Sequence, residues 1–299
     1  MSRVLVVGDV LTDVLAVHSA PLAIDSDIVA RISITGGGSV ANTAAWLAHL
    51  GRPVDLVAVA GEDVAGTDRL AELTAAGVSC ATVRRTPDAP TGSVVVLAQA
   101  QHRTMLSDRG ANLLLRPSDV DSALATLPDV VHLHLSGYVL LDESSRPAGR
   151  HALAAARERG LSASVDAAAA ARLERAGPAA FRGWISGVDL LFANLDEART
   201  LTGADLDAAS AARELTGTAP HAVVKRGPDG AVWATRDGPL SAAPGVPVEV
   251  VDSTGAGDAF AAAALHAWLD GADVPTALRA AVHAGARAVT HLGGRPTLL

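Results

Sequence analysis

The chain has 299 residues, enough for one large α/β domain or two smaller ones. Its formal net charge of −8 argues against a nucleic-acid or membrane-surface partner, because proteins that bind these surfaces need a basic face. The single cysteine, Cys80, excludes an internal disulfide framework and any cysteine-based zinc site.

The first ten residues, MSRVLVVGDV, predict a strand followed by a Gly-Asp turn. They lack the basic-then-apolar layout and the cleavage site of a signal peptide. No apolar run approaches the roughly 20 residues that a helix needs to cross a bilayer. We therefore expect a soluble protein located in the cytoplasm.

Short runs rich in valine and leucine alternate along the chain with alanine-rich stretches. The runs predict strands at Val4–Val7, Leu56–Val59, Val130–Leu135, Ser162–Asp166, Leu190–Ala193, Ala222–Lys225 and Val248–Val251. The stretches predict helices that include Thr43–Leu50, Asp68–Ala76, Ala148–Arg159, Ala208–Thr216, Ala259–Asp270 and Pro275–His291. Strands that are apolar on both faces and alternate with helices are typical of a mostly parallel sheet covered on both sides. We expect a doubly wound α/β fold.

Two segments interrupt this alternation. Residues 11–35 contain strand-like pieces and no helix, and residues 91–109 predict a hairpin with a polar tip at Gln99–His102. They form either a small β-sheet lid over the main sheet or two ordinary surface hairpins, and we favour the lid. Because no linker or repeat is visible, we expect one domain over residues 1–299 with these two segments inserted.

The stretch VVDSTGAGDAFAAAAL, from Val250 to Leu265, places small residues between a predicted strand and a predicted helix. The first N–H groups of a helix have no partner within the helix, and the helix dipole adds positive charge there. Glycine lets the backbone approach a ligand closely, so the turn is suited to an anion. Asp258 at the helix start either accepts a proton from a hydroxyl or simply caps the helix.

The order D-x-T-G-A-G-D over residues 252–258 resembles the signature of the ribokinase, or PfkB, family of carbohydrate and nucleoside kinases. Four further motifs in the family's order extend the resemblance over nearly the whole chain. It implies a ribokinase-like fold and transfer of the γ-phosphate of MgATP to a hydroxyl of a small carbohydrate. Gly255, Ala256 and Gly257 are then the anion hole for the transferring phosphoryl group, and Asp258 is the base. Asp252 and Thr254 match positions that coordinate a monovalent cation in many relatives, so activation by K⁺ is a hypothesis.

Two of these motifs lie near the N-terminus. In VVGDVLTD, Asp13 matches the family's carboxylate that binds substrate hydroxyls, although a solvated turn residue is the alternative. In TGGGSVANTAAWLAHLG, Gly37 and Gly38 let the backbone approach a sugar, and Asn42 offers a donor and an acceptor at a helix start. No Lys-Ser/Thr pair follows the glycines, so the segment is not a Walker A loop.

The other two motifs follow core strands of the second half. Asn194 and Glu197 of NLDEA match the family's N-x-x-E motif, which orders Mg²⁺ and phosphates largely through water. Lys225, Gly227 and Gly230 of VVKRGPDGAVWA match a nucleotide loop, K-x-G-x-x-G, and Lys225 is the only lysine of the chain. Taken alone, the first of these motifs would be an ordinary N-cap with a glutamate in the first turn.

Three positions depart from ribokinase itself. Ser39 stands where ribokinase has a lysine, Leu11 where it has an asparagine, and Ser136 where it has a glutamate that contacts ribose. These differences leave the kinase interpretation intact and put ribose in doubt. In SDRGANLL, Arg109 and Asn112 either face the substrate or lie in a surface loop.

Several alternatives stay open at this point. A nucleoside kinase for adenosine or pseudouridine is a rival, but the two inserted segments contain no aromatic residue to hold a base, which favours a plain sugar. A non-catalytic sugar- or nucleotide-binding regulator on the same scaffold is a rival of another class, although it would be expected to lose the base. The alternating His132 and His134 share one strand face and suit a metal, but no third ligand is evident. A homodimer through the lid is plausible because exposed strand edges can pair.

Overall fold

A large, mostly parallel sheet forms the centre of the computed structural model, which describes residues 2–22, 24–99 and 102–297. Eight strands are hydrogen-bonded in the order β14-β13-β12-β11-β10-β9-β1-β4. The pairs β12–β13 and β13–β14 are antiparallel, and the other pairs are parallel. The strands are β1 (Arg3–Val7), β4 (Val54–Val57), β9 (Val130–Ser136), β10 (Ser162–Asp166), β11 (Leu190–Asn194), β12 (His221–Lys225), β13 (Ala231–Thr235) and β14 (Leu240–Ala243).

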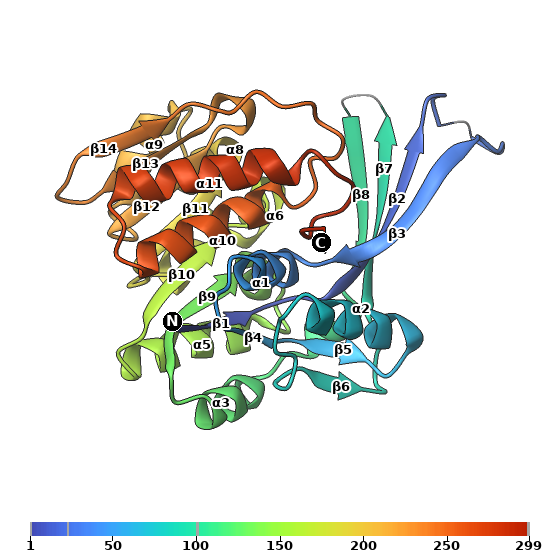
Figure 1. Cartoon of the computed structure of the whole chain (residues 1–299), viewed down its shortest axis with the longest axis horizontal. Coiled ribbons are helices and arrows are strands. Elements are labelled where there is room, and N and C mark those ends of the chain that lie inside the picture. Colours follow the sequence, from blue (N-terminus) through green and yellow to red (C-terminus); the bar gives the residue numbers. More distant parts are fainter. Residues whose placement is uncertain (1, 23, 100–101, 298–299) are drawn as a thin grey trace.

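Helices cover both faces of this sheet, which confirms the predicted doubly wound fold (Figure 1). Within β1, Val4 and Val6 pack into one apolar cluster, and Leu5 and Val7 pack into another on the opposite face. The first cluster takes in α1 (Ser39–His49), α2 (Val64–Ala75), α10 (Ala256–Leu269) and α11 (Val274–Ala288). The second takes in α3 (Pro117–Thr126), α4 (Gly137–Leu141), α5 (Arg146–Glu158), α6 (Ala170–Ala176), α7 (Pro178–Trp184), α8 (Leu195–Thr202) and α9 (Ala208–Leu215). None of the helices in the described ranges is both long and apolar enough to span a membrane.

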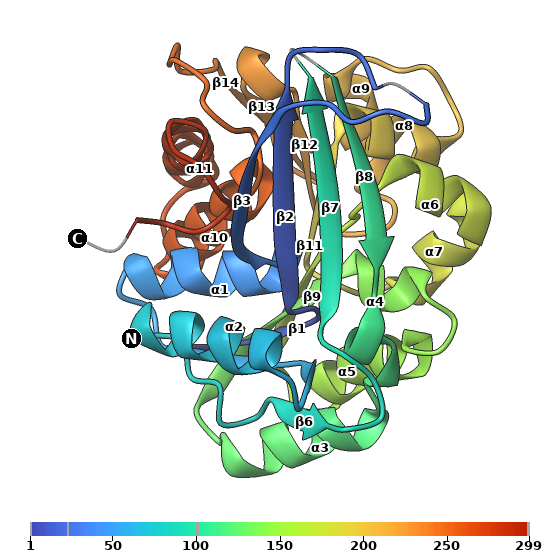
Figure 2. The same cartoon turned by 90° about the vertical axis from the view of Figure 1, so that its right-hand side faces the viewer.

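A separate sheet of four strands stands at one end of the molecule (Figure 2). Its order is β3-β2-β7-β8, from β2 (Leu11–His18), β3 (Ala30–Gly37), β7 (Gly92–Gln99) and β8 (His102–Asp108). These strands come from the two segments that were predicted to interrupt the alternation, and β7 and β8 pair as the predicted hairpin. Residues 100–101 of its expected tip lie outside the described residues. A further pair, β5 (Val59–Gly61) and β6 (Arg84–Thr86), is parallel.

The strand predicted at Val248–Val251 is wrong. Residues 244–250 form an extended connection without strand pairing between β14 and α10, and β14 supplies the edge of the sheet instead. The run is rich in valine, which favours a strand, but Val250 and Val251 are 63% and 54% exposed and have no neighbouring strand. Residues with high β-propensity form a strand only where a partner strand is available. Residues 244–250 follow β14, the edge strand of the large sheet, and do not pair with it.

The chain turns sharply at Gly38, the N-cap residue of α1. Its φ of +102° lies in the left-handed region that side chains avoid. A Cβ atom at this position would sit 2.4 Å from the carbonyl oxygen of Asp9. Only glycine therefore lets the end of β3 approach the loop after β1, and this approach places the start of α1.

We expect Gly38→Ala to destabilise the protein by about 2–5 kcal/mol, because left-handed strain and the collision with the Asp9 carbonyl add together. Gly203→Ala is the matched control, since Gly203 also has a positive φ (+71°) but no atom within 4 Å of its Cβ position. The control should cost only about 1–2 kcal/mol. Thermal unfolding of both variants measures the difference, and equal losses would contradict the collision.

Candidate active site

One cavity of about 1210 Å³ lies between the small sheet, the first turns of α1 and α10, and the ends of β10, β11 and β12. All the site residues predicted from the sequence line it, apart from Gly37 and Asp252. The lining residues come from segments as distant in the chain as Asp13 and Asp258. Folding thus brings five separate motifs to one hollow large enough for a nucleotide and a small second ligand.

Asp258 lies in the first turn of α10 and faces the first turn of α1. One carboxylate oxygen accepts a hydrogen bond from Ser39 Oγ (2.9 Å), and the other accepts one from Asn42 Nδ2 (2.9 Å). Burial raises the pKa of Asp258 to about 7, although both hydrogen bonds act in the opposite direction. A carboxyl group with this pKa is ready to take up a proton near neutral pH.

The turn before α10 packs closely against its surroundings. Gly255, its N-cap, has a φ of +75°, and a Cβ there would lie 2.4 Å from Gly294. A Cβ on Gly257 would lie 3.1 Å from Lys225 Nζ. The backbone of the turn is therefore open to the cavity without side chains, and the first N–H groups of α10 and the lysine ammonium lie together as donors for an anion.

Charged groups gather at the ends of β10, β11 and β12. Lys225 Nζ lies 2.7 Å from Asp166 Oδ2. Burial alone would lower the pKa of Lys225, but the carboxylates of Asp166 and Glu197 outweigh it and raise that pKa. The lysine is therefore cationic and fixed in place.

Asn194 and Glu197 form a reciprocal cap at the start of α8. Asn194 accepts from the Glu197 N–H (2.8 Å), and the two Glu197 oxygens accept from the Asn194 N–H (2.8 Å) and side-chain amide (2.7 Å). Burial raises the pKa of Glu197 to about 7, and Asp166 acts in the same direction. The pair is thus a helix cap, as the sequence alternative proposed, and it also faces the cavity.

Asp13 lies on β2 with Gly37 beside it on β3, where a Cβ would be 2.2 Å from its carboxylate. Burial raises the pKa of Asp13 to about 6, and the nearby Arg295 opposes this rise. Arg295 donates to the Gly37 carbonyl (3.2 Å) and pairs with Glu72 (3.0 Å). The glycine at position 37 therefore makes room for the acid, and the C-terminal segment holds this strand pair in place.

The two glycines after Lys225 shape a tight loop that lines the cavity. Gly227 and Gly230 have φ values of +59° and +87°, and a Cβ on Gly230 would be 2.1 Å from the Ala243 carbonyl. Asp252, which does not line the cavity, accepts from the N–H groups of Thr254 (2.9 Å) and Gly293 (3.0 Å). Asp252 thus ties the turn before α10 to the C-terminal segment from behind the cavity wall.

The two residues of SDRGANLL have different positions. Arg109 lines the cavity, where it pairs with Asp9 (2.9 Å) and Asp142 (3.1 Å). Asn112 instead bonds the backbone of Val10 through both its amide oxygen and its amide nitrogen, at 3.0 Å each. Asn112 therefore holds the loop after β1, and Arg109 faces the site.

Several cavity residues were missed by sequence reasoning, among them Asp166, Tyr138 and Arg172. Asp166 ends a core strand beside the strand that ends in Asn194, and that placement was the available signal. Tyr138 and Arg172 follow no recognisable motif, so nothing in the local sequence indicated them.

His132 and His134 are buried in the sheet and hydrogen-bond to serines. His132 contacts Ser162 (2.8 Å) and Ser164 (2.7 Å), and His134 contacts Ser164 (2.8 Å). Burial lowers their pKa values to about 3 and about 4. Among the described residues no group of three side chains could hold a metal ion, so these histidines are neutral members of the core.

Comparisons with known proteins identify the family and the fold of the chain. The family model described as pfkB family carbohydrate kinase matches residues 1–298. The chain is 32% identical to an ATP-dependent ribose-1-phosphate kinase of Halopiger xanaduensis, and the match covers 99% of this chain and 94% of that protein. The structure superposes on an adenosine kinase from Sinorhizobium meliloti with a TM-score of 0.88 at 23% identity, covering 99% and 96% of the two chains. It also superposes on a candidate ribokinase II from E. coli in complex with ATP and Mg²⁺, with a TM-score of 0.87, 25% identity and coverage of 98% and 94%.

The raised pKa of Asp258 implies that the stability of the fold depends on pH. The folded state binds the proton more tightly than the unfolded state, so this group stabilises the fold at low pH and loses that contribution as the pH rises through about 7. Asp258→Asn cannot ionise and avoids the loss. We expect the free energy of unfolding of the variant minus that of wild type to be roughly 2–3 kcal/mol larger at pH 8 than at pH 5.

Denaturant unfolding at the two pH values measures this difference. Asp205→Asn is the control, because the Asp205 side chain is 88% exposed and should leave the wild-type pH dependence unchanged. Parallel pH dependences for wild type and Asp258→Asn would contradict the raised pKa.

Proposed function

The chain belongs to the pfkB family of carbohydrate kinases and is an ATP-dependent phosphotransferase that acts on a hydroxyl group, and on this premise we propose that Asp258 is its catalytic base. The observation that carries the proposal is the half-buried Asp258 carboxylate, which lines the cavity at the N-terminus of α10, beside the Gly-Ala-Gly turn and Lys225. A base and an anion site on one helix start are the two elements that phosphoryl transfer to an alcohol needs.

In the proposed reaction the acceptor hydroxyl oxygen attacks the γ-phosphorus of ATP, and the bond from that phosphorus to the bridging oxygen of ADP breaks. Asp258 takes the hydroxyl proton. The N–H groups of residues 255–257 stabilise the negative charge on the transferring phosphoryl group, and Lys225 adds its positive charge. Ser39 and Asn42 hold the carboxylate by their hydrogen bonds, so the base is fixed before the substrate binds.

The acidic end of the cavity fits Mg²⁺. Asp166 and Glu197 bring two carboxylates to the side where Lys225 lies, and Asn194 occupies part of the hydrogen-bonding capacity of Glu197. Mg²⁺ binds oxygen ligands and keeps several waters, so we propose that these residues hold it partly through water. When bound, the ion neutralises charge on the phosphates of ATP.

The two ends of the cavity suit different parts of the substrates. Asp13, Gly37, Gly38 and Asn42 are proposed to bind the hydroxyls of the acceptor on the side of the small sheet. The cavity lining also has an apolar group from the segment before α10 and from α11 and the residue after it, namely Val248, Val250, Val282 and Val289. We propose that the adenine ring lies there, with Gly227 and Gly230 beside the phosphates.

We propose a sugar or a sugar-like molecule as the acceptor. Among the described residues, the part of the small sheet that faces the cavity presents aliphatic side chains, among them Leu11, Val94 and Val96, and no aromatic residue. The ring of Tyr138 lies in the cavity wall, but the guanidinium groups of Arg109 and Arg172 are only 5.0 and 5.5 Å from its centroid. The ring is thus occupied by cations and poorly placed to stack on a nucleobase.

The exposed edges of the small sheet support a homodimer. β3 and β8 are its edge strands, and Ile32, Ile34, Met105 and Leu106 are between 51% and 65% exposed on them. Apolar edge strands are sites where two chains pair. We propose that two copies associate through this sheet.

The cytoplasmic location expected from the sequence stays a prediction.

We propose that K⁺ binds near Asp252 and Thr254 and supports activity by ordering the turn before α10. Turnover should be higher in potassium chloride than in tetramethylammonium chloride at equal ionic strength. Equal turnover in the two salts would contradict the proposal, and sodium chloride serves as a control for ion size.

The kinase reaction is tested by ADP release from MgATP with a panel of pentoses, hexoses, keto-sugar acids and nucleosides. Asp258→Asn should keep its ATP affinity and lose about 10²- to 10⁴-fold in kcat on the accepted substrate. For wild type, kcat/KM should fall as the pH drops below about 7, since only the ionised carboxylate accepts a proton.

Asp205→Asn, at an exposed position, should turn over like wild type. Near-native kcat in Asp258→Asn would remove Asp258 from the role of base.

A further inference from the structure

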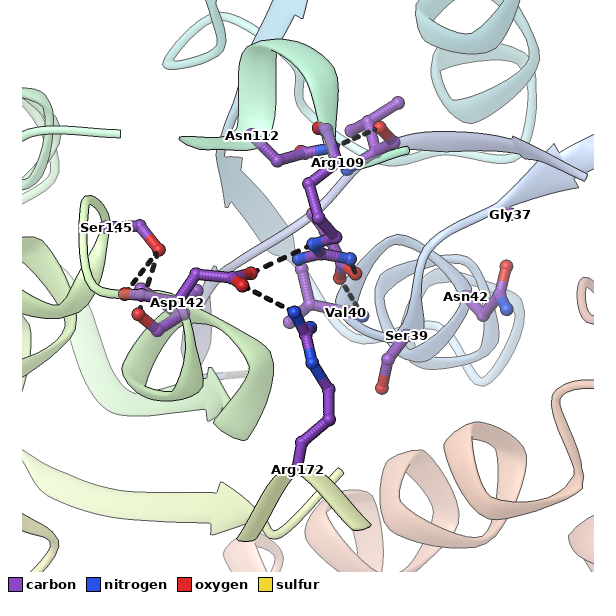
Figure 3. A network of polar contacts seen from close by, with 12 residues as sticks. Gly37, Ser39, Val40, Asn42, Arg109, Asn112, Asp142, Ser145 and Arg172 are labelled. Carbon is purple, nitrogen blue, oxygen red and sulfur yellow. Dashed lines mark hydrogen bonds and ion pairs between the residues drawn. The ribbon is translucent and has the colours of Figure 1, made fainter. Parts of the chain in front are cut away.

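Two arginines from distant segments meet at one carboxylate in the cavity wall. Arg109 follows the end of β8, and Arg172 lies on α6. Asp142 binds Arg109 Nε through one oxygen (3.1 Å) and Arg172 Nη2 through the other (2.6 Å). Figure 3 shows the Arg109 side chain reaching the Asp142 carboxylate from above and the Arg172 side chain reaching it from below. Both guanidinium groups also lie beside the ring of Tyr138, so their positions are fixed by shared partners.

Both oxygens of each carboxylate in this cluster accept a hydrogen bond from within the protein. Asp9, 1% exposed, accepts from the Val40 N–H (3.3 Å) and from Arg109 Nη1 (2.9 Å). Asp142 uses one oxygen for each arginine and does not line the cavity. Asp142 therefore lies outside the cavity lining, whereas Asp9 lines the cavity and accepts from the Arg109 guanidinium beside it.

Donors of both arginines remain for a ligand. Within the described part of the chain, Arg109 Nη2 and the Nε and Nη1 groups of Arg172 have no hydrogen-bond acceptor. The Arg172 side chain is 31% exposed and lines the cavity together with Arg109. Planar guanidinium groups with free N–H donors are the preferred protein partners of phosphate and carboxylate groups.

The cluster lies on the acceptor side of the proposed base. Asp9, which holds Arg109, also binds the N–H of Val40, and the preceding residue, Ser39, donates to Asp258. Lys225, the cavity lysine, lies instead against Gly257 and Asp166 on the side assigned to the phosphates of ATP. The two arginines thus form a second group of cations, separate from the donor phosphates.

We propose that Arg109 and Arg172 form a subsite for an anionic group of the acceptor, so that the substrate is a sugar carrying a phosphate or a carboxylate and not a neutral sugar. The inference rests on the proposed kinase function and names the substrate class of the same site. An anion would otherwise be disfavoured here, because Asp13 and Asp258 bring acidic groups to the acceptor side. The unused N–H donors of the arginine pair give such an anion charge-assisted hydrogen-bond partners.

Steady-state kinetics with matched acceptors tests the subsite. Ribose is compared with ribose 1-phosphate and ribose 5-phosphate, and a neutral hexose with a keto-sugar acid, all at saturating MgATP. The anionic member of one pair should have a kcat/KM at least about 10-fold higher than its neutral partner. A preference for a ribose phosphate over ribose identifies phosphate as the anion that the subsite binds, and a preference for the keto-sugar acid over the neutral hexose identifies carboxylate. Inorganic phosphate should compete with the acceptor and not with ATP if the anion is a phosphate.

Variants then separate the subsite from the rest of the site. Arg172→Gln should raise the KM for the anionic acceptor by roughly 10- to 100-fold and lower the ratio of anionic to neutral kcat/KM, while the KM for ATP stays near its wild-type value. Arg172→Lys keeps the charge and should recover part of this loss. Arg175→Gln, on the exposed face of the same helix, is the matched control and should behave like wild type.

The outcomes are distinct from failure of the kinase proposal. No ADP release with any acceptor would contradict the proposed function. Turnover of neutral and anionic acceptors with equal kcat/KM, unchanged in Arg172→Gln, would overturn the subsite and leave the kinase intact. If Arg172→Gln raises only the KM for ATP, Arg172 binds the phosphates of ATP, and this result would also overturn the proposed acceptor subsite.

Discussion

The contact between the first turns of α1 and α10 is the interaction on which the proposed chemistry depends. Ser39 and Asn42 reach Asp258 across 219 and 216 positions of sequence, and both bonds measure 2.9 Å. The close approach is possible because the facing residues are small, with Ala41, Ala44 and Ala45 buried on α1 and a run of buried alanines on α10. Packing of small side chains thus brings the proposed base and its two hydrogen-bond donors within reach of each other.

Electrostatics divides the cavity into two halves. On one side, Lys225 is locked to Asp166 and lies against the glycine turn, where the proposed donor phosphates would meet a cation and helix N–H groups. On the other side, the Arg109–Asp142–Arg172 cluster carries its own balancing acids. Asp258 lies between the halves, and its burial raises its pKa toward neutrality. Buried charges with different partners therefore give each substrate its own environment.

Much of the fold and of the candidate site was predictable from local patterns. The alternation of apolar strands and alanine-rich helices predicted the doubly wound sheet, and Ser162–Asp166 was placed with its correct bounds. The strand predicted at the valine-rich run Val248–Val251 was wrong, because β-propensity does not tell whether a partner strand is present. The strands β13 and β14 (Ala231–Thr235 and Leu240–Ala243) were missed for the related reason that the edge of a sheet is defined by its neighbours.

The sequence by itself determined the motifs whose backbone conformation is set by near neighbours in the chain: the glycine turn before α10, the Asn194–Glu197 cap and the acid at the start of α10. Only the tertiary structure decided which side chains meet across the cavity. It joined Arg109 and Arg172 at one carboxylate, turned Asn112 to the backbone of Val10 and paired Ser39 with Asp258. Turns and caps depend on a few neighbouring residues, whereas these contacts depend on the packing of whole helices and sheets.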